Sequence, residues 1–104
     1  MTNQTWIKVA EDGDIEDEEA ICVTHDGAKV AVYYVDGTYY ATENQCTHEV
    51  ASLSEGYIDG TTVECPLHQG VFCLKTGKAL AAPAEKPVRT FPVKVEDGSV
   101  YIQV

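Results

Sequence analysis

The sequence predicts an all-β fold in which short antiparallel strands form a sandwich or barrel, and two observations support this. First, Asp-Gly pairs recur at residues 12–13, 26–27, 36–37, 59–60 and 97–98, and most lie between segments rich in Val, Ile, Tyr and Thr. This is the pattern of strands joined by tight hairpin turns. Second, no segment shows the sustained apolar period of a long helix. Many short strands with tight turns are typical of sandwiches and barrels.

Nine segments are candidate strands because β-branched, aromatic and other apolar residues dominate most of them. In chain order they are residues 6–9, 20–25, 29–35, 38–42, 57–58, 62–64, 71–74, 89–95 and 100–104. The first two are separated by the segment 11–19, which holds seven acidic residues. We expect a solvated connection there, with room for one helical turn.

Length and charge bound the function. A chain of 104 residues is about one small domain, so we expect a single domain over residues 1–104. The formal charge is -10, from 17 Asp and Glu against 7 Lys and Arg. Such a surface repels phosphate backbones and anionic lipid, which makes nucleic acid and membranes poor partners. It suits a protein partner with a basic patch, although the acids also serve solubility alone.

The sequence gives an expectation about the compartment. No stretch approaches the roughly 18 apolar residues that cross a bilayer. Residues 1–6 carry no basic segment followed by an apolar run, so no signal peptide or twin-arginine tag is visible. We therefore expect a cytoplasmic protein. In that reducing compartment the four cysteines are expected to be metal ligands or free thiols rather than two disulfides.

Two short motifs carry the candidate chemistry. Cys46 and His48 form a C-x-H box, Cys65 and His68 form a C-x-x-H box, and residues 49–64 separate them. Both boxes fall between candidate strands, where a loop projects side chains beyond a rigid sheet. In extended backbone, residues two apart point the same way, so the first box aims its two side chains into one space. The four residues are candidate metal ligands.

The sequence around these boxes resembles that of the small Rieske [2Fe-2S] ferredoxins that serve bacterial aromatic-ring-hydroxylating dioxygenases. The resemblance runs from about residue 40 to 95 without a gap, and its matching segments are residues 40–42, 46–48, 52–56, 64–68, 72–80 and 91–93. It implies a Rieske fold of stacked antiparallel sheets, with a cluster-binding subdomain of two loops at one tip. That subdomain would span roughly residues 44–85.

The resemblance also implies one Rieske-type [2Fe-2S] cluster. Cys46 and Cys65 would hold the inner iron, and His48 and His68 would hold the outer iron. A structural zinc site is the alternative, because two thiolates and two imidazoles also satisfy tetrahedral zinc. The spacing argues against zinc, since such sites usually group their ligands as C-x2-4-C and H-x3-5-H.

By resemblance the chain is a soluble one-electron carrier between an NADH-dependent flavoprotein ferredoxin reductase and a terminal Rieske oxygenase. It is not expected to be an enzyme. With the four ligands assigned only His25 remains, whereas a mononuclear iron facial triad needs two histidines and a carboxylate. There is also no Gly-rich dinucleotide fingerprint. The alternative function is a non-redox structural module, either with a zinc site or as a Rieske-like accessory subunit.

Differences from respiratory-complex Rieske proteins predict a low reduction potential. Ala51 and Leu67 stand where those proteins carry two clamping cysteines, and Gly70 and Phe72 stand where they carry hydroxyl donors. Fewer hydrogen bonds to cluster sulfur lower the potential, to about -150 mV. Glu49 follows His48 where ferredoxins of this kind have Gly, and its carboxylate is expected to lower the potential further.

The remaining cysteines and histidine are expected to be structural. Cys22 lies between Ile21 and Val23, and Cys73 lies between two further apolar residues. Both are therefore predicted to be small core hydrophobes. His25 precedes an Asp-Gly turn and is predicted to be an ordinary surface residue.

Overall fold

Eleven strands and one turn of 3-10 helix make up the described part of the chain, which is residues 5–45, 51–66, 70–82 and 86–104 of a computed structural model. The elements are β1 (Trp6–Glu11), β2 (Glu19–His25), β3 (Ala28–Val35), β4 (Thr38–Glu43), η1 (Leu53–Glu55), β5 (Tyr57–Asp59), β6 (Thr62–Glu64), β7 (Val71–Cys73), β8 (Ala79–Ala81), β9 (Thr90–Phe91), β10 (Val93–Glu96) and β11 (Ser99–Gln103). The predicted all-β class is confirmed. Within these residues no helix is long and apolar enough to cross a membrane.

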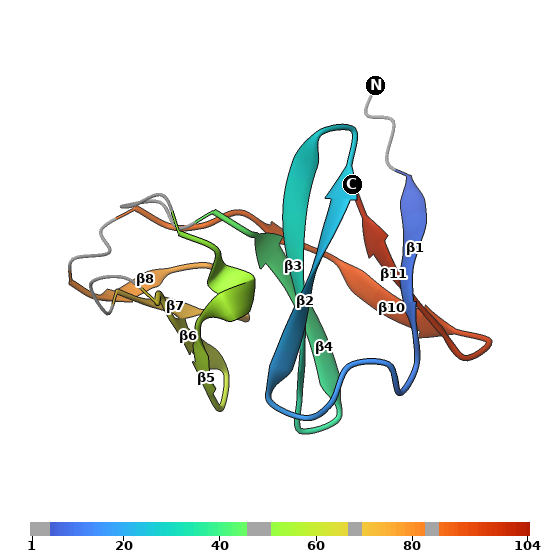
Figure 1. Cartoon of the computed structure of the whole chain (residues 1–104), viewed down its shortest axis with the longest axis horizontal. Helices are drawn as coiled ribbons and strands as arrows, with labels where there is room; N and C mark the ends of the chain where they lie inside the picture. The colour runs from blue at the N-terminus through green and yellow to red at the C-terminus, as the bar shows by residue number, and fades with distance from the viewer. Residues whose placement is uncertain (1–4, 46–50, 67–69, 83–85) are drawn as a thin grey trace.

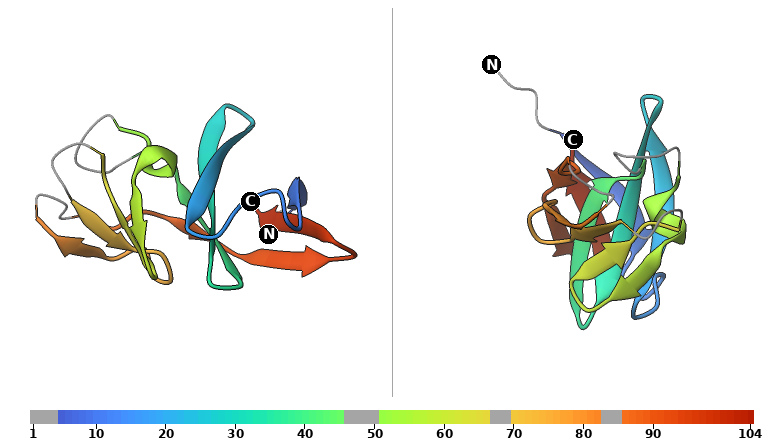
Figure 2. Two further views of the ribbon diagram at one scale, coloured as in Figure 1. Left: turned by 60° about the horizontal axis from the view of Figure 1, so that its bottom comes forward. Right: turned by 90° about the vertical axis from the view of Figure 1, so that its left-hand side faces the viewer.

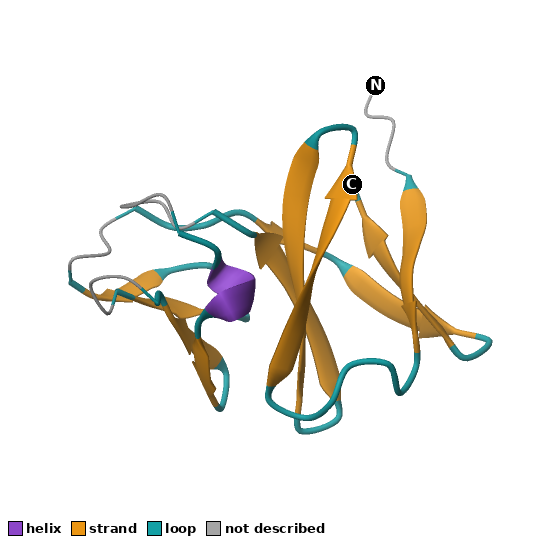
Figure 3. Cartoon of the chain, in the orientation of Figure 1, coloured by secondary structure: helices purple, strands orange, loops and turns teal. Residues whose placement is uncertain are grey.

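The strands form three antiparallel sheets. Their strand orders are β1-β11-β10, β2-β3-β4-β9 and β5-β6-β7-β8. Figures 1 and 3 show the β5–β8 sheet at one end of the molecule, with η1 between it and the four-stranded sheet that begins with β2. The three-stranded sheet packs on the opposite side of that central sheet, as the turned views of Figure 2 also show. The expected stacking of antiparallel sheets is confirmed.

Three of the predicted Asp-Gly turns have the backbone that a two-residue hairpin requires. Both turn residues have positive φ in the pairs 26–27, 36–37 and 97–98, with φ between 48° and 82°. Asp and Gly tolerate this left-handed region better than most residues, and the resulting twist matches that of the flanking strands. These turns join β2 to β3, β3 to β4 and β10 to β11.

The strand predicted over residues 89–95 is two strands. Pro92 separates β9, which pairs with β4, from β10, which pairs with β11. Proline has no N–H to donate to a ladder, so the chain leaves one sheet there and enters the next. Two elements were absent from the sequence prediction. These are η1 and β8, and β8 is hard to see because its two alanines have low strand propensity.

The acidic segment between β1 and β2 is a connection of turns, and the structure describes no helix in it. Its residues are mostly exposed, as predicted, but Ile15 is only 3% exposed. Ile15 belongs to the apolar cluster that includes Val100 and Ile102. One apolar side chain thus anchors an otherwise solvated segment to the fold.

Two apolar cores lie on the two faces of the central sheet. The base core, against the three-stranded sheet, consists of Ala10, Ile15, Val30, Val32, Ala41, Val100 and Ile102. The site-side core, toward β5–β8, consists of Ala31, Tyr33, Val35, Leu53, Val63, Cys65, Phe72, Leu74 and Val88. Strand β3 supplies both cores, because its successive side chains point to opposite faces. Strand β3 therefore lies between the two cores and contributes to each.

The prediction that Cys22 and Cys73 are core residues is wrong. Cys22 is exposed and Cys73 is half-buried. Phe72 of β7 and Leu74, directly after the strand, are the buried neighbours, so the alternation of the chain turns Cys73 outward. His25 is partly exposed, as expected for a surface residue, and its Nε2 lies 3.4 Å from an Asp26 carboxylate oxygen.

Candidate metal centre

The structure describes one of the four predicted ligands. Cys65 lies within the described residues, whereas Cys46, His48 and His68 lie outside them. Among the described residues no group of three or more His, Cys, Asp or Glu is placed to hold a metal ion. The site is therefore built from Cys65 and from the residues that flank the two boxes.

Cys65 begins the second box directly after strand β6. Its side chain is 0% exposed and belongs to the site-side core. Its backbone N–H donates to the Gly70 carbonyl oxygen at 2.7 Å, just before β7 begins. This bond extends the β6–β7 pairing and ties together the two ends of the segment that contains His68. The thiol position is thus fixed and screened from water.

The first box is flanked by an equally closed pair of ends. Gln45 and Ser52 form an isolated antiparallel bridge at the two ends of the segment 46–51. One residue further out, the Leu53 N–H donates to the Asn44 carbonyl oxygen at 2.6 Å. The segment with Cys46 and His48 therefore leaves β4 and returns to η1 through a paired stem.

Residues beside the first box pack in the same core as Cys65 of the second box. Ala51, on the return side of the first box, packs against the core cluster that contains Leu53 and Cys65. Gly56 lets the chain after η1 pass close to β6, because a Cβ there would overlap the Glu64 carbonyl oxygen and touch Val63. Its φ of -78° is ordinary, so the glycine is needed for space and not for backbone freedom.

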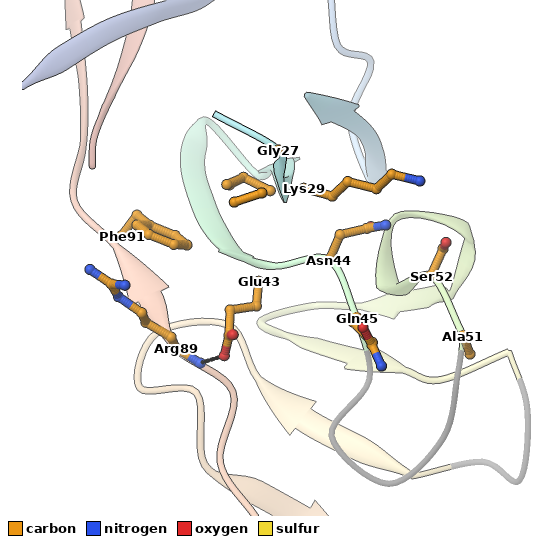
Figure 4. A pocket seen from close by; sticks show the side chains of 11 residues that line it. Gly27, Lys29, Glu43, Asn44, Gln45, Ala51, Ser52, Arg89 and Phe91 are labelled. Carbon is orange, nitrogen blue, oxygen red and sulfur yellow. Dashed lines mark hydrogen bonds between the residues drawn. The ribbon is translucent and has the colours of Figure 1, made fainter. Parts of the chain in front are cut away.

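A hollow of about 550 Å³ lies beside the stem of the first box. Figure 4 shows Gln45, Ala51 and Ser52 on one side of it, with Glu43, Arg89 and Phe91 opposite. Glu43 Oε1 accepts the backbone N–H of Arg89 at 2.8 Å, and the Arg89 guanidinium lies 4.8 Å from the Phe91 ring centroid. The Lys29 and Arg89 side chains point apart in Figure 4, so the hollow has no focused positive charge.

A buried hydroxyl pair supports the strand that leads into the first box. The Tyr33 hydroxyl lies 2.8 Å from Thr42 Oγ1, and that oxygen donates to the Glu43 carbonyl at 2.8 Å. Because the Thr42 proton is used there, Tyr33 is the donor of the first bond. Burial raises the pKa of the Tyr33 phenol far above its usual value, so it stays protonated.

Cys73 is the other cysteine near the site-side core with a notable environment. The Thr76 side chain hydrogen-bonds to its sulfur, and this lowers the pKa of the Cys73 thiol below its usual value. Cys73 sits on β7, opposite Thr62 of β6, on the face that points away from the buried Phe72. It is not placed as a ligand beside Cys65.

Sequence reasoning missed Asn44. Its side chain is buried, with 3% of the residue exposed, and its Oδ1 accepts the Ser54 N–H at 3.0 Å. The signal was available, because Asn readily bonds nearby backbone and this one stands between a strand and the first cysteine.

The chemistry of the donor set fits a [2Fe-2S] cluster. Two thiolates and two imidazoles are the ligands of a Rieske centre, and the described thiol is buried where an inner iron would be screened. The two stems provide closed backbone supports on either side. The residues present thus fit the group that the sequence implied.

Comparison with known proteins gives the same result. The family model described as "Rieske [2Fe-2S] domain" matches residues 5–92. The ferredoxin component of the naphthalene 1,2-dioxygenase system of Pseudomonas putida is 46% identical over 99 residues, which cover 95% of each chain.

Two solved structures superpose closely. A chain from the complex of reduced oxygenase and oxidized ferredoxin in carbazole 1,9a-dioxygenase has a TM-score of 0.91 and 44% identity, over 96% of this chain and 94% of that one. The ferredoxin of Sphingomonas yanoikuyae B1 has a TM-score of 0.90 and 40% identity, over 96% and 99% of the two chains. The buried cysteine, the paired stems and these similarities over nearly the whole length agree, and the chain belongs to the Rieske [2Fe-2S] domain family.

Proposed function

We propose that this protein is a one-electron carrier, the ferredoxin of an aromatic-ring-hydroxylating dioxygenase system. It receives electrons from an NADH-dependent flavoprotein reductase and delivers them to a terminal Rieske oxygenase. The observation that carries the proposal is the 46% identity, over 95% of both chains, to a ferredoxin component of a naphthalene dioxygenase system. The partners perform the bond-making chemistry, and this chain is not itself a catalyst.

Four residues would hold one Rieske-type [2Fe-2S] cluster: Cys46 and Cys65 through sulfur, and His48 and His68 through imidazole nitrogen. When bound, the cluster supplies reversible one-electron chemistry at a potential raised by the two imidazoles. Cys65 supports this assignment, because it is buried at the end of β6 and its backbone is fixed by Gly70.

The protein's own residues keep water from the thiolate side and hold the ligand segments in place. Phe72, Val63 and Leu53 are each 0% exposed and belong to the same core as Cys65. A low-dielectric surrounding of this kind tunes a metal group's potential and keeps solvent off its sulfur. The formal charge of -10 supports brief, charge-guided encounters with a basic partner surface.

The proposal extends to organisation and location. Residues 1–104 form a single domain whose cluster-binding part spans roughly residues 44–85, and the protein works in the cytoplasm. The β5–β8 sheet and both ligand boxes fall within that part of the chain, which supports the boundary.

The test is an anaerobic redox titration of the purified protein, with metal analysis and electron paramagnetic resonance. We expect two iron and two sulfide per chain, one reversible electron, and a midpoint near the low end of the Rieske range, at about -150 mV. Delivery is tested by adding the protein to the remaining components of the naphthalene 1,2-dioxygenase system and measuring product. Colourless protein with one zinc per chain and no one-electron wave would overturn the proposal.

A further inference from the structure

The first two backbone amides of η1 bond to one residue outside the helix. The Leu53 N–H donates to the Asn44 carbonyl oxygen at 2.6 Å, and the Ser54 N–H donates to Asn44 Oδ1 at 3.0 Å. The opening N–H groups of a helix have no partner within it, and they cost free energy when left unpaired. Asn44, which precedes residues 46–50 in the chain, therefore caps the helix that follows them.

The residue that ordinarily has this role does not take it. Ser52 stands at the N-cap position of η1, yet its side chain makes no capping hydrogen bond. Serine at that position commonly accepts from the second or third amide of the helix. Here the Ser54 amide, the second of η1, bonds to Asn44 instead.

The backbone of Asn44 is itself bonded to strand β3 of the central sheet. Its N–H donates to the Lys29 carbonyl of β3 at 3.1 Å, and only 3% of the residue is exposed. In Figure 4 its side chain points from the end of β4 toward the turn that carries Ser52. The cap thus connects η1 to the central sheet and not merely to a neighbouring loop.

We propose that Asn44 is a positioning residue for the cofactor site. By capping η1 it fixes Leu53 and Ser54, which follow the segment that carries Cys46 and His48, against the central sheet and beside the core that contains Cys65. This inference rests on the proposed function, because it assumes that these residues bind the [2Fe-2S] cluster. Groups that orient metal ligands commonly contribute 10–100-fold, roughly, to metal retention.

The side-chain bond can be tested apart from the backbone bond. Any residue at position 44 keeps the carbonyl that accepts from Leu53. Only a side chain with a suitably placed oxygen accepts from Ser54, so Asn44→Ala removes that bond while Asn44→Asp keeps an acceptor. Asp17→Ala is the matched control, since Asp17 Oδ1 accepts the Asp36 N–H at 2.7 Å in the connection between β1 and β2.

The first measurement is the rate at which loaded protein releases iron to a chelator. We expect Asn44→Ala to release iron about 10–100-fold faster than the wild type. Asn44→Asp should stay within about twofold of the wild type, because its oxygen still accepts the amide. Asp17→Ala should be unchanged. The reduced-state paramagnetic spectrum should change in Asn44→Ala and not in Asp17→Ala, which separates positioning from general loss of stability.

The second measurement is amide hydrogen exchange at Ser54. In the wild type this amide should exchange slowly, and in Asn44→Ala about tenfold faster, while the Val100 amide of the base core is unchanged. If Asn44→Ala does not fold, slow exchange of the Ser54 amide in both the wild type and Asn44→Asp supports the cap, and free exchange in either overturns it.

Any of the following results would overturn the role of Asn44: iron release from Asn44→Asp as fast as from Asn44→Ala, equal acceleration in Asp17→Ala, or a Ser54 amide that exchanges as freely as the turn amide of Gly27. A wild-type chain that binds no [2Fe-2S] cluster would instead overturn the proposed function, and this role with it. A loaded chain whose Asn44→Ala variant keeps its iron overturns the positioning role alone.

Discussion

The base core and the site-side core are enclosed by strands of different length. The base core is covered by β1, β10 and β11, of six, four and five residues, and both cores share the central sheet, in which β2 to β4 have six to eight residues. On the site side, β5, β6, β7 and β8 have three residues each. Long ladders fix a strand by many repeated bonds, whereas three-residue strands have few. The ligand-bearing end therefore depends on single contacts, such as the Cys65–Gly70 bond and the buried Phe72 ring.

The largest effect is expected from removing the buried cysteine. Cys65→Ala should abolish the [2Fe-2S] cluster, because its thiolate is a proposed ligand, while the strands around the base core still form. Cys22→Ala is the control, since Cys22 lies exposed on β2 and should leave the cluster intact. Iron and sulfide content, visible absorbance and far-ultraviolet circular dichroism report the result. Equal cluster content in the two variants would remove Cys65 from the site.

Truncating one buried side chain in each core tests whether the two ends differ in function as well as in structure. Phe72→Ala should lower the free energy of unfolding by about 3–5 kcal/mol, and Ile102→Ala by about 2–5 kcal/mol, since both are 0% exposed. Denaturant titration measures both. Under conditions where each variant is folded, only Phe72→Ala should release iron faster. Faster release from both would mean that the cores act as one unit.

Tyr33 links the two regions, because it lies on the central sheet but points into the site-side core. Tyr33→Phe should cost about 0.5–1.5 kcal/mol at neutral pH by removing the bond to Thr42. The raised pKa of the Tyr33 phenol means that the unfolded chain loses its proton first as pH rises. The wild type should thus lose stability above about pH 10, and the variant should lose less. Parallel pH curves for the two proteins would contradict this.

The smallest effect is expected from one charge beside the proposed outer ligand. Glu49→Gln should raise the midpoint by up to about 40 mV, since a unit charge in water is worth about 1 kcal/mol even at a separation of about 4 Å. Glu18→Gln, in the acidic connection of the base, makes the same change in net charge and should not shift the midpoint. An unchanged midpoint in Glu49→Gln would show that solvent screens this carboxylate.

The hairpins of the central sheet were predictable from the sequence. The pairs Asp26-Gly27 and Asp36-Gly37 predicted their hairpins because the turn chemistry and the strand propensity are both local. Only one end of each of these strands differs, by one residue. The division at Pro92 was not predicted, because a continuous apolar run looks the same whether it serves one sheet or two.

The candidate ligands of the site could be predicted from the sequence, but the residues that hold the ligand segments in place could not. The spacing of the two boxes pointed to the family, and the comparisons confirm that family, while the assignment of Cys46, His48, Cys65 and His68 as ligands remains a prediction. Asn44 was not found, because its value lies in a bond to Ser54 across the ligand segment. The outward turn of Cys22 was likewise missed, since apolar neighbours on both sides do not say which face of a strand is buried.

The pairing of β4 with β9 has a consequence for how this architecture can change. Thr42 lies opposite Thr90, and the Glu43 N–H donates to the Arg89 carbonyl at 2.9 Å, so everything between these residues leaves and rejoins the central sheet at adjacent positions. Two antiparallel neighbours can be joined by a two-residue turn. The intervening 44–88 stretch is therefore an insertion between two neighbouring strands, and any replacement for it must still cover the face that β3 presents through Ala31, Tyr33 and Val35.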